Sequence, residues 1–251
     1  MDLQLAGRCA LITGASSGIG QGIAVALAAE GVRVAISARS VEALAETTRL
    51  IAAAGGAEPV RLPADLTVKS DVDRLAQEAR NALPGLDILV SNAGGSRPMS
   101  DWNDEETWEE AFELNFTSSR RLTQLLIDDV KASGRGRILA ITGSLTTRLV
   151  NAASPAKAAL ASWARAISFE IAPYGATINC LAPGKIESRQ ILERIHPTEE
   201  SRAKVIAESI PIGRFGTPAE FGFIAACLVS PRASYVNGAI IPIDAGMARL
   251  A

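Results

Sequence analysis

The stretch Cys9-Ala10-Leu11-Ile12-Thr13-Gly14-Ala15-Ser16-Ser17-Gly18-Ile19-Gly20 decides the fold of this chain. Its first five residues are an apolar run that predicts a short buried strand, and the glycine-rich segment after them predicts a tight turn. Residues 19–30 are rich in alanine and leucine and predict a helix. In such a strand–turn–helix unit, glycines let the backbone approach a pyrophosphate and the helix N-terminus offers free N–H groups. The segment therefore predicts a dinucleotide site at Gly14, Gly18 and Gly20.

Strand-like and helix-like segments alternate along the rest of the chain. Strict alternation indicates a parallel sheet with helices on both faces and right-handed crossovers. The prediction is a single-domain, doubly wound Rossmann-type α/β fold of about seven strands over residues 1–251. Ligands of such sheets bind at the C-terminal ends of the strands. The further strands are expected at 32–37, 60–63, 86–91, 137–142, 176–181 and 239–243, and the further helices at 41–54, 71–81, 107–131, 156–172 and 218–229.

The composition argues against several classes of function. The 251 residues are 48% hydrophobic and carry a net charge of −2, so no basic surface favours binding to nucleic acid or to an anionic membrane. No apolar run reaches the roughly 18 residues of a membrane span, and the N-terminus lacks a signal-peptide pattern. Three scattered cysteines and one histidine predict buried reduced thiols, no metal site and a cytoplasmic location.

Residues 185–211 interrupt the alternation. They carry charges of both signs and two X-Pro steps, contain no strand-like run, and lie between the sixth and seventh predicted strands. A long insertion at this position favours a substrate lid, with a structural helix pair as the alternative. An anionic substrate is an open alternative, because the segment contains Arg189, Arg194 and Arg202.

The end of the second predicted strand favours NADP(H) over NAD(H). The chain there has Ile36-Ser37-Ala38-Arg39-Ser40, with no acidic residue to hold the ribose hydroxyls of NAD. The planar guanidinium of Arg39 suits a 2′-phosphate by charge and by shape. The alternative is that Arg39 is a solvated loop cation.

The motifs, taken in order, resemble those of the short-chain dehydrogenase/reductases. They are Thr13-Gly14-Ala15-Ser16-Ser17-Gly18-Ile19-Gly20, Asp65-Leu66, Asn92-Ala93-Gly94, Asn115, Lys157 and Pro183-Gly184-Lys185-Ile186-Glu187-Ser188. The resemblance spans essentially the whole chain. It implies an oxidoreductase for a small carbonyl or alcohol substrate, and a homo-oligomer, tetramer or dimer. The cofactor-binding residues that it implies, beside Arg39, are Gly14, Ser16, Ser17, Gly18, Ile19, Gly20, Asp65, Leu66, Asn92, Ala93, Gly94, Lys157, Pro183, Gly184, Ile186 and Ser188.

The catalytic end departs from the family's pattern. Relatives use an asparagine, a serine, a tyrosine and a lysine, and Asn115 and Lys157 match the first and the last of these. Ala153 stands four residues before Lys157, at the position of the acid/base tyrosine. The family's serine falls on Gly143, although a slip of the loop would bring Ser144 or Thr142 to the substrate carbonyl. The resemblance then implies Asn115, Ser144 and Lys157 as the catalytic residues.

Without a proton donor the reaction rate should be lower by about 10²–10⁴-fold, because this is the usual contribution of a positioned acid. Three replacements are open: Lys157 itself, since buried lysines shift their pKa readily; a water near Asn115 and Lys157; or electrostatic stabilisation by Arg148. The sequence favours an NADP(H)-dependent oxidoreductase with an altered proton donor. The alternatives are a non-catalytic NADP(H)-binding protein and a non-redox lyase or isomerase that uses Lys157 as its base.

Overall fold

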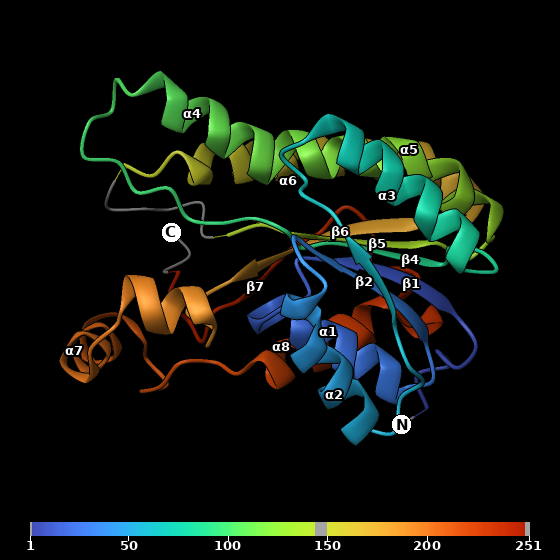
Figure 1. Ribbon diagram of the computed structural model, residues 1–251, viewed down its shortest axis with the longest axis horizontal. Helices are drawn as coiled ribbons and strands as arrows, with labels where there is room; N and C mark the ends of the chain where they lie inside the picture. The colour runs from blue at the N-terminus through green and yellow to red at the C-terminus, as the bar shows by residue number, and fades with distance from the viewer. Residues whose placement is uncertain (1, 144–149, 249–251) are drawn as a thin grey trace.

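A single parallel sheet forms the centre of the molecule (Figure 1). The computed structural model describes residues 2–143 and 150–248, and these contain a seven-stranded sheet in the order β3-β2-β1-β4-β5-β6-β7. Neighbouring strands pair in parallel throughout. The predicted Rossmann-type fold is therefore confirmed. The strands are β1 (Cys9–Thr13), β2 (Arg33–Ala38), β3 (Val60–Pro63), β4 (Ile88–Ser91), β5 (Arg137–Ile141), β6 (Thr177–Pro183) and β7 (Ile240–Ile243).

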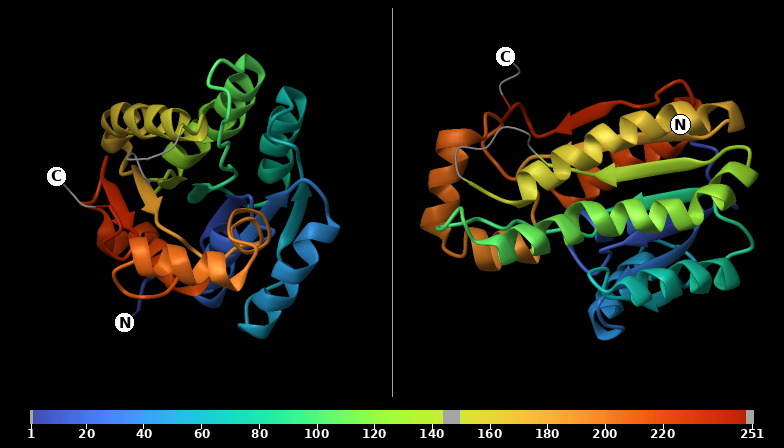
Figure 2. Two further views of the ribbon diagram at one scale, coloured as in Figure 1. Left: turned by 90° about the vertical axis from the view of Figure 1, so that its left-hand side faces the viewer. Right: turned by 90° about the horizontal axis from the view of Figure 1, so that it is seen from above.

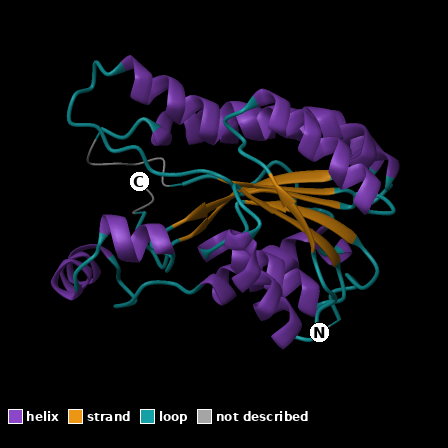
Figure 3. Cartoon of the chain, viewed as in Figure 1, coloured by secondary structure: helices purple, strands orange, loops and turns teal. Residues whose placement is uncertain are grey.

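Helices cover both faces of the sheet, so that the strands form a middle layer (Figure 3). One face carries α1 (Gly18–Ala29), α2 (Ala45–Ala53) and α8 (Pro218–Val229), and the other carries α3 (Lys69–Ala82), α4 (Glu105–Phe112), α5 (Ser118–Ala132) and α6 (Ala153–Ile171). Successive side chains of a strand point to opposite faces. Leu11 accordingly belongs to the core under α3, α5 and α6, and Ile12 to the core against α1 and α8. This two-sided burial explains why β1 is apolar at every position.

Two of the predicted helices are wrong in detail. The helix expected at 107–131 is interrupted by a π-helical turn, η2 (Glu113–Thr117), between α4 and α5. The helix expected at 41–54 begins with a short 3-10 segment, η1 (Glu42–Leu44), before α2. Sequence periodicity cannot show a π turn, because one inserted residue leaves both flanking helices amphipathic.

The segment at 185–211 forms two helical pieces, the π-helical η4 (Gln190–Ile195) and α7 (Glu199–Ser209). Every residue of α7 is at least partly exposed. Figure 2 shows α7 beyond the sheet, on the side to which the strand arrows point. The helix pair thus stands at the edge where ligands of such sheets bind.

The cysteines are free, as the sequence predicted. Cys9 and Cys180 are buried, but Cys227 is only half-buried, so the expectation of burial was wrong for Cys227. In the described part of the chain, no helix is long and apolar enough to cross a membrane.

Candidate active site

Asn92 clamps the glycine turn after β1 to the end of β4. Its Nδ2 donates hydrogen bonds of 3.0 Å to the carbonyl oxygens of Thr13 and Gly14, and its backbone N–H donates to Thr13 Oγ1 at 3.0 Å. A Cβ at Gly14 would lie 2.8 Å from Asn92 Nδ2, and a Cβ at Gly20 would lie 2.4 Å from the same atom. A side chain at Gly14 or Gly20 would collide with Asn92, so the Asn92-Ala93-Gly94 motif packs against this turn because both positions are glycine.

The N-terminus of α1 is uncapped by side chains. Ser17 occupies the N-cap with extended backbone, its side chain makes no capping hydrogen bond, and the first turn holds no acidic residue. The free N–H groups and the positive end of the helix dipole are the features that suit a pyrophosphate. A Cβ at Gly18 would lie 2.6 Å from the Cβ of Ser188, so the segment after β6 lies against this turn. The residues present thus fit a dinucleotide cofactor.

The ends of β2 and β3 lie side by side at the same edge. Ala38 pairs with Pro63, and the N–H of Ala64 donates to the carbonyl of Ala38 at 2.9 Å. Arg39 is exposed and makes no ion pair within the described residues. Leu66 is buried in the core beside α3, so its side chain is already engaged. Arg39 is therefore the group of this edge that is available to an anion.

Asn115 fixes the turn after β4 relative to η2. The side chain is buried; its Oδ1 accepts from the N–H of Gly95 at 2.9 Å, and its Nδ2 donates to the carbonyl of Ala111 at 2.9 Å. A Cβ at Gly94 would lie 2.8 Å from Asn115 Oδ1 and 3.7 Å from Lys157 Nζ. The structure thus brings the side chains of Asn115 and Lys157 together beside Gly94.

Lys157 is the titratable group of this cluster. Its Nζ donates a hydrogen bond of 2.9 Å to the carbonyl oxygen of Thr142. Loss of hydration on burial lowers the pKa of Lys157 to about 8. No carboxylate of the described residues pairs with this ammonium. Both the protonated and the neutral amine are consequently populated near pH 8, so that Lys157 can give or take a proton there.

The positions of the expected tyrosine and serine are small. Ala153 is buried at the start of α6, and its N–H donates to Asn151 Oδ1 at 3.1 Å. A Cβ at Gly143 would lie 3.3 Å from Lys157 Cδ, so Gly143 borders the lysine side chain. Ser144 and Arg148, both named from the sequence as candidate groups, lie outside the described residues.

Residues 96–98 contact Asn151 beside Ala153, and the sequence analysis did not predict this contact. Pro98 and Asn151 form an antiparallel bridge. Asn151 Nδ2 donates to Ser96 Oγ at 2.7 Å, and Asn151 Oδ1 accepts from the N–H of Arg97 at 3.0 Å. An asparagine just before a helix is a capping signal that the sequence does contain. Nothing in the sequence pattern pairs Asn151 with residues 96–98.

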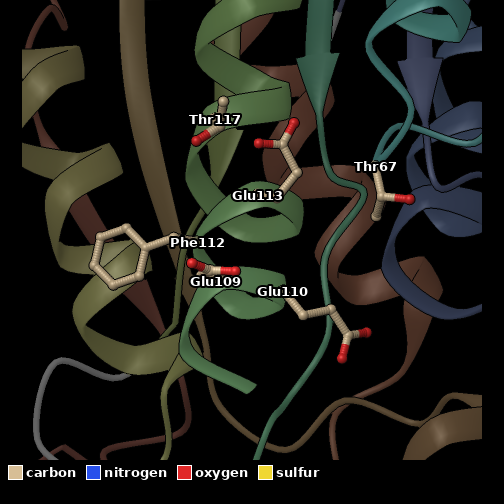
Figure 4. A pocket seen from close by; sticks show the side chains of 6 residues that line it. All are labelled: Thr67, Glu109, Glu110, Phe112, Glu113 and Thr117. Carbon is tan, nitrogen blue, oxygen red and sulfur yellow. The ribbon is translucent and has the colours of Figure 1, made fainter. Parts of the chain in front are cut away.

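A groove of about 580 Å³ lies elsewhere, between Thr67 in the segment after β3 and the residues of α4 and η2 (Figure 4). None of the residues that line it was predicted as a site residue. Glu110 is paired with Arg97 at 2.6 Å, and Glu113 with Arg121 at 2.9 Å. The acidic side chains are thus largely engaged, and we do not assign the groove to a substrate. Its lining is Thr67, Glu109, Glu110, Phe112, Glu113 and Thr117.

This sheet order, with a glycine turn after the central first strand, defines a Rossmann-type protein. Residues 14–248 match the family model described as "Enoyl-(Acyl carrier protein) reductase". The chain belongs to this family and is a member of the short-chain dehydrogenase/reductases.

Relatives and solved structures extend the match over the whole chain. The rhamnolipids biosynthesis 3-oxoacyl-[acyl-carrier-protein] reductase of Pseudomonas aeruginosa is 36% identical over 251 residues, which cover 96% of each chain. L-sorbose reductase from Gluconobacter frateurii, complexed with NADPH and L-sorbose, superposes with a TM-score of 0.93 at 28% identity and full coverage of both chains. The Pseudomonas aeruginosa RhlG/NADP active-site complex gives 0.89 at 35% identity and 98% coverage of each.

Proposed function

We propose that this chain is an NADP(H)-dependent oxidoreductase that reduces a carbonyl or oxidises the corresponding alcohol, with Lys157 handling the proton. The observation that carries the proposal is the placement of the Lys157 ammonium beside the turn that holds Gly94 and Gly95. A Cβ added at Gly94 would lie 3.7 Å from Lys157 Nζ, and Asn115 bonds to the N–H of Gly95. Its pKa of about 8 suits proton transfer near neutral pH. The 3-oxoacyl-[acyl-carrier-protein] reductase and the L-sorbose reductase named above are oxidoreductases, which supports the reaction class.

The cofactor is proposed to lie along the C-terminal edge of the sheet. The uncapped N-terminus of α1 would hold the pyrophosphate, and Arg39 the 2′-phosphate. Lys157 would reach the nicotinamide ribose, with Pro183-Gly184 and Ile186 beside the nicotinamide. NADPH and NADP in the neighbouring structures support this assignment. A reduced nicotinamide held there would supply the hydride that a carbonyl carbon accepts.

Proton transfer is then the task of this chain's own side chains. A carbonyl oxygen that gains negative charge needs a proton, and the ammonium of Lys157 can donate one. The neutral amine recovers its proton from water. Thr142 holds the ammonium by its carbonyl oxygen, which accepts the hydrogen bond and leaves the remaining N–H groups of Lys157 for substrate.

The segment 185–211 is proposed as the substrate lid. Ser188 lies against Gly18, as described above, and Gln190 Nε2 lies 3.6 Å from the Cβ position of Gly95. The start of the segment therefore spans from the glycine turn to the turn beside Lys157. A segment in contact with both turns can enclose a substrate between them.

The first experiment combines NADPH binding with turnover. Fluorescence titration would measure binding, and NADPH oxidation would be followed with a panel of ketones and β-keto thioesters. Binding with turnover that Lys157→Ala abolishes and Lys69→Ala leaves intact is the expected result; Lys69 is an exposed lysine at the start of α3. Turnover that survives Lys157→Ala would refute the role given to this lysine.

A second candidate function is a non-catalytic NADP(H)-binding protein. The observation that favours it is Ala153, which leaves a buried methyl where a phenol would act. Tight NADPH binding without oxidation of any panel member would establish this alternative. Substrate conversion without any change in NADPH absorbance would instead indicate a lyase or isomerase that uses Lys157 as its base.

A homo-oligomer is also proposed. Large apolar side chains are exposed on α6, on α8, on the edge strand β7 and just before it, and an exposed edge strand with apolar side chains favours association with another chain. These side chains are Phe169, Phe223, Tyr235 and Ile240. Light scattering after size exclusion should give a dimer or tetramer, and Phe169→Glu with Tyr235→Asp should lower the mass.

A further inference from the structure

We propose that Lys185 and His196 form an anion subsite in the lid, which holds a carboxylate or phosphate group of the substrate. The inference rests on the proposed function for the identity of the bound molecule as a substrate. The anion binding itself stands on the contacts of these two residues.

Lys185 and His196 both contact the Phe215-Gly216 segment. The carbonyl of Lys185 accepts from the N–H of Gly216 at 2.9 Å, and Ile186 and Gly216 form a parallel bridge. The His196 ring lies 6.1 Å from the Phe215 ring, centroid to centroid. Two residues that are 11 positions apart in the chain are thereby held on one short strip of backbone.

Both basic groups lack an acidic partner in the described part of the chain. Lys185 is half-buried and makes no side-chain hydrogen bond or ion pair there. His196 Nδ1 contacts Ser201 Oγ at 3.1 Å, but His196 Nε2 is buried and has no partner among the described residues. An unpartnered buried polar atom is costly, so His196 Nε2 has an unused capacity for a hydrogen bond.

The electrostatic effects on Lys185 and His196 also favour a bound anion. Burial lowers the pKa of Lys185, and burial together with the nearby Lys185 charge lowers the pKa of His196. Arg202 adds a third basic group, because its Nη1 donates to the carbonyl of His196 at 3.4 Å. The nearby carboxylate of Glu187 is exposed; the pKa of Arg214 is raised mainly by its hydrogen bonds to Glu220, and Glu187 adds to this effect. An anion would offset the nearby Lys185 charge and, with Ser201 Oγ donating to Nδ1 and the ring proton on Nε2, would accept a hydrogen bond from His196 Nε2.

The subsite adjoins the cofactor and catalytic positions. Lys185 immediately precedes the Ile186–Ser188 stretch, whose last residue touches the glycine turn, while Gln190 reaches the turn beside Lys157. A substrate carbonyl near Lys157 would therefore leave its far end within the reach of the lid. The substrate class that fits is a short oxo acid or an oxo phosphate.

The test is calorimetric binding to the NADP⁺-loaded full chain, in which no reduction can occur. Acetoacetate is compared with methyl acetoacetate, which has the same ketone without the charge. Inorganic phosphate serves as the second anion, and it separates a phosphate site from a carboxylate site. The variants are Lys185→Gln, His196→Gln and Lys185→Arg, with Lys204→Gln as control because Lys204 is an exposed lysine of the same lid.

Lys185→Gln is expected to weaken binding of the preferred anion by about 10- to 100-fold, the usual effect of losing a charge-assisted hydrogen bond. His196→Gln should weaken it less, whereas Lys185→Arg and Lys204→Gln should bind like the parent. Unchanged NADP⁺ affinity would show that the variants are folded. Equal binding of acid and ester by the parent, or anion binding that Lys185→Gln and His196→Gln leave intact, would overturn the subsite.

The two proposals fail in distinguishable ways. A parent chain that binds acetoacetate or phosphate through Lys185 but never oxidises NADPH with any carbonyl supports the subsite and refutes the oxidoreductase. If the parent chain reduces methyl acetoacetate, and binds acetoacetate no more tightly than this ester, the subsite is refuted and the oxidoreductase proposal is supported.

Discussion

The ammonium of Lys157 donates a hydrogen bond of 2.9 Å to the carbonyl oxygen of Thr142, directly after β5 ends. Thr142 is itself held by the sheet, since its N–H and its Oγ1 donate to the carbonyl of Leu181 at 2.9 and 3.2 Å. The lysine is therefore anchored to a fixed point of the sheet rather than to a mobile side chain. Ala153 carries no ionisable group, so Lys157 is the titratable side chain that the described residues place in this cluster.

The first prediction concerns pH. The lowered pKa of Lys157, about 8, means that the ammonium prevails below this pH and the neutral amine above it. If the ammonium donates the proton, carbonyl reduction should slow as pH rises through about 8, and alcohol oxidation should speed up over the same range. Rates in both directions between pH 6 and 10 measure this.

Lys157→Arg is the control for the pH profile, because a guanidinium stays protonated throughout this range. Its residual rate of reduction should show no inflection near pH 8. A parent profile that is flat in both directions would mean that another group supplies the proton.

The second prediction introduces a phenol at Ala153, where the family resemblance implies one. Ala153→Tyr combined with Gly143→Ser should raise turnover by about 10²–10⁴-fold, the usual contribution of a positioned acid. The added Cβ at Gly143 would lie 3.3 Å from Lys157 Cδ, so the flexible lysine stem needs to move by only a few tenths of an ångström. Steady-state NADPH oxidation with the best substrate of the panel measures the gain.

Ala153→Phe with Gly143→Ser is the matched control, since it adds the ring without the hydroxyl. It should show no gain in turnover. A gain of equal size in both double variants would attribute the effect to packing around α6 rather than to the phenol.

The sequence predicted the central strands well because β1, β4 and β5 are buried at every position and most of their residues are apolar. β1 and β3 begin and end where expected. The contacts that shape the site were not predictable in the same way. The Asn151–Ser96 bond and the placement of His196 on Phe215 join segments that are distant in the chain, and neither has a local pattern. The π turn around Asn115 also lacks a periodic signal.

The third prediction concerns the clamp between β1 and β4. Asn92→Ala removes the Nδ2 bonds to the carbonyls of Thr13 and Gly14 but keeps the backbone bonds. The free energy of unfolding should fall by about 1–3 kcal/mol, because two acceptors lose their donor. Urea unfolding measures the loss. Asn103→Ala, which removes an exposed 3.3 Å contact within its own loop, should be neutral, and an equal loss in both variants would refute the clamp.

The last prediction concerns the choice of cofactor. Arg39→Glu should weaken NADPH binding by about 10- to 100-fold, since it replaces a charge-assisted partner of the 2′-phosphate by a like charge. NADH binding should improve, because a carboxylate at this edge can accept bonds from ribose hydroxyls. Arg33→Glu is the matched control: Arg33 is also exposed but lies at the opposite end of β2, away from the edge where cofactors bind. Fluorescence titration with both cofactors separates the cases, and an Arg39→Glu chain that keeps its NADPH affinity would leave Arg39 as a solvated loop cation.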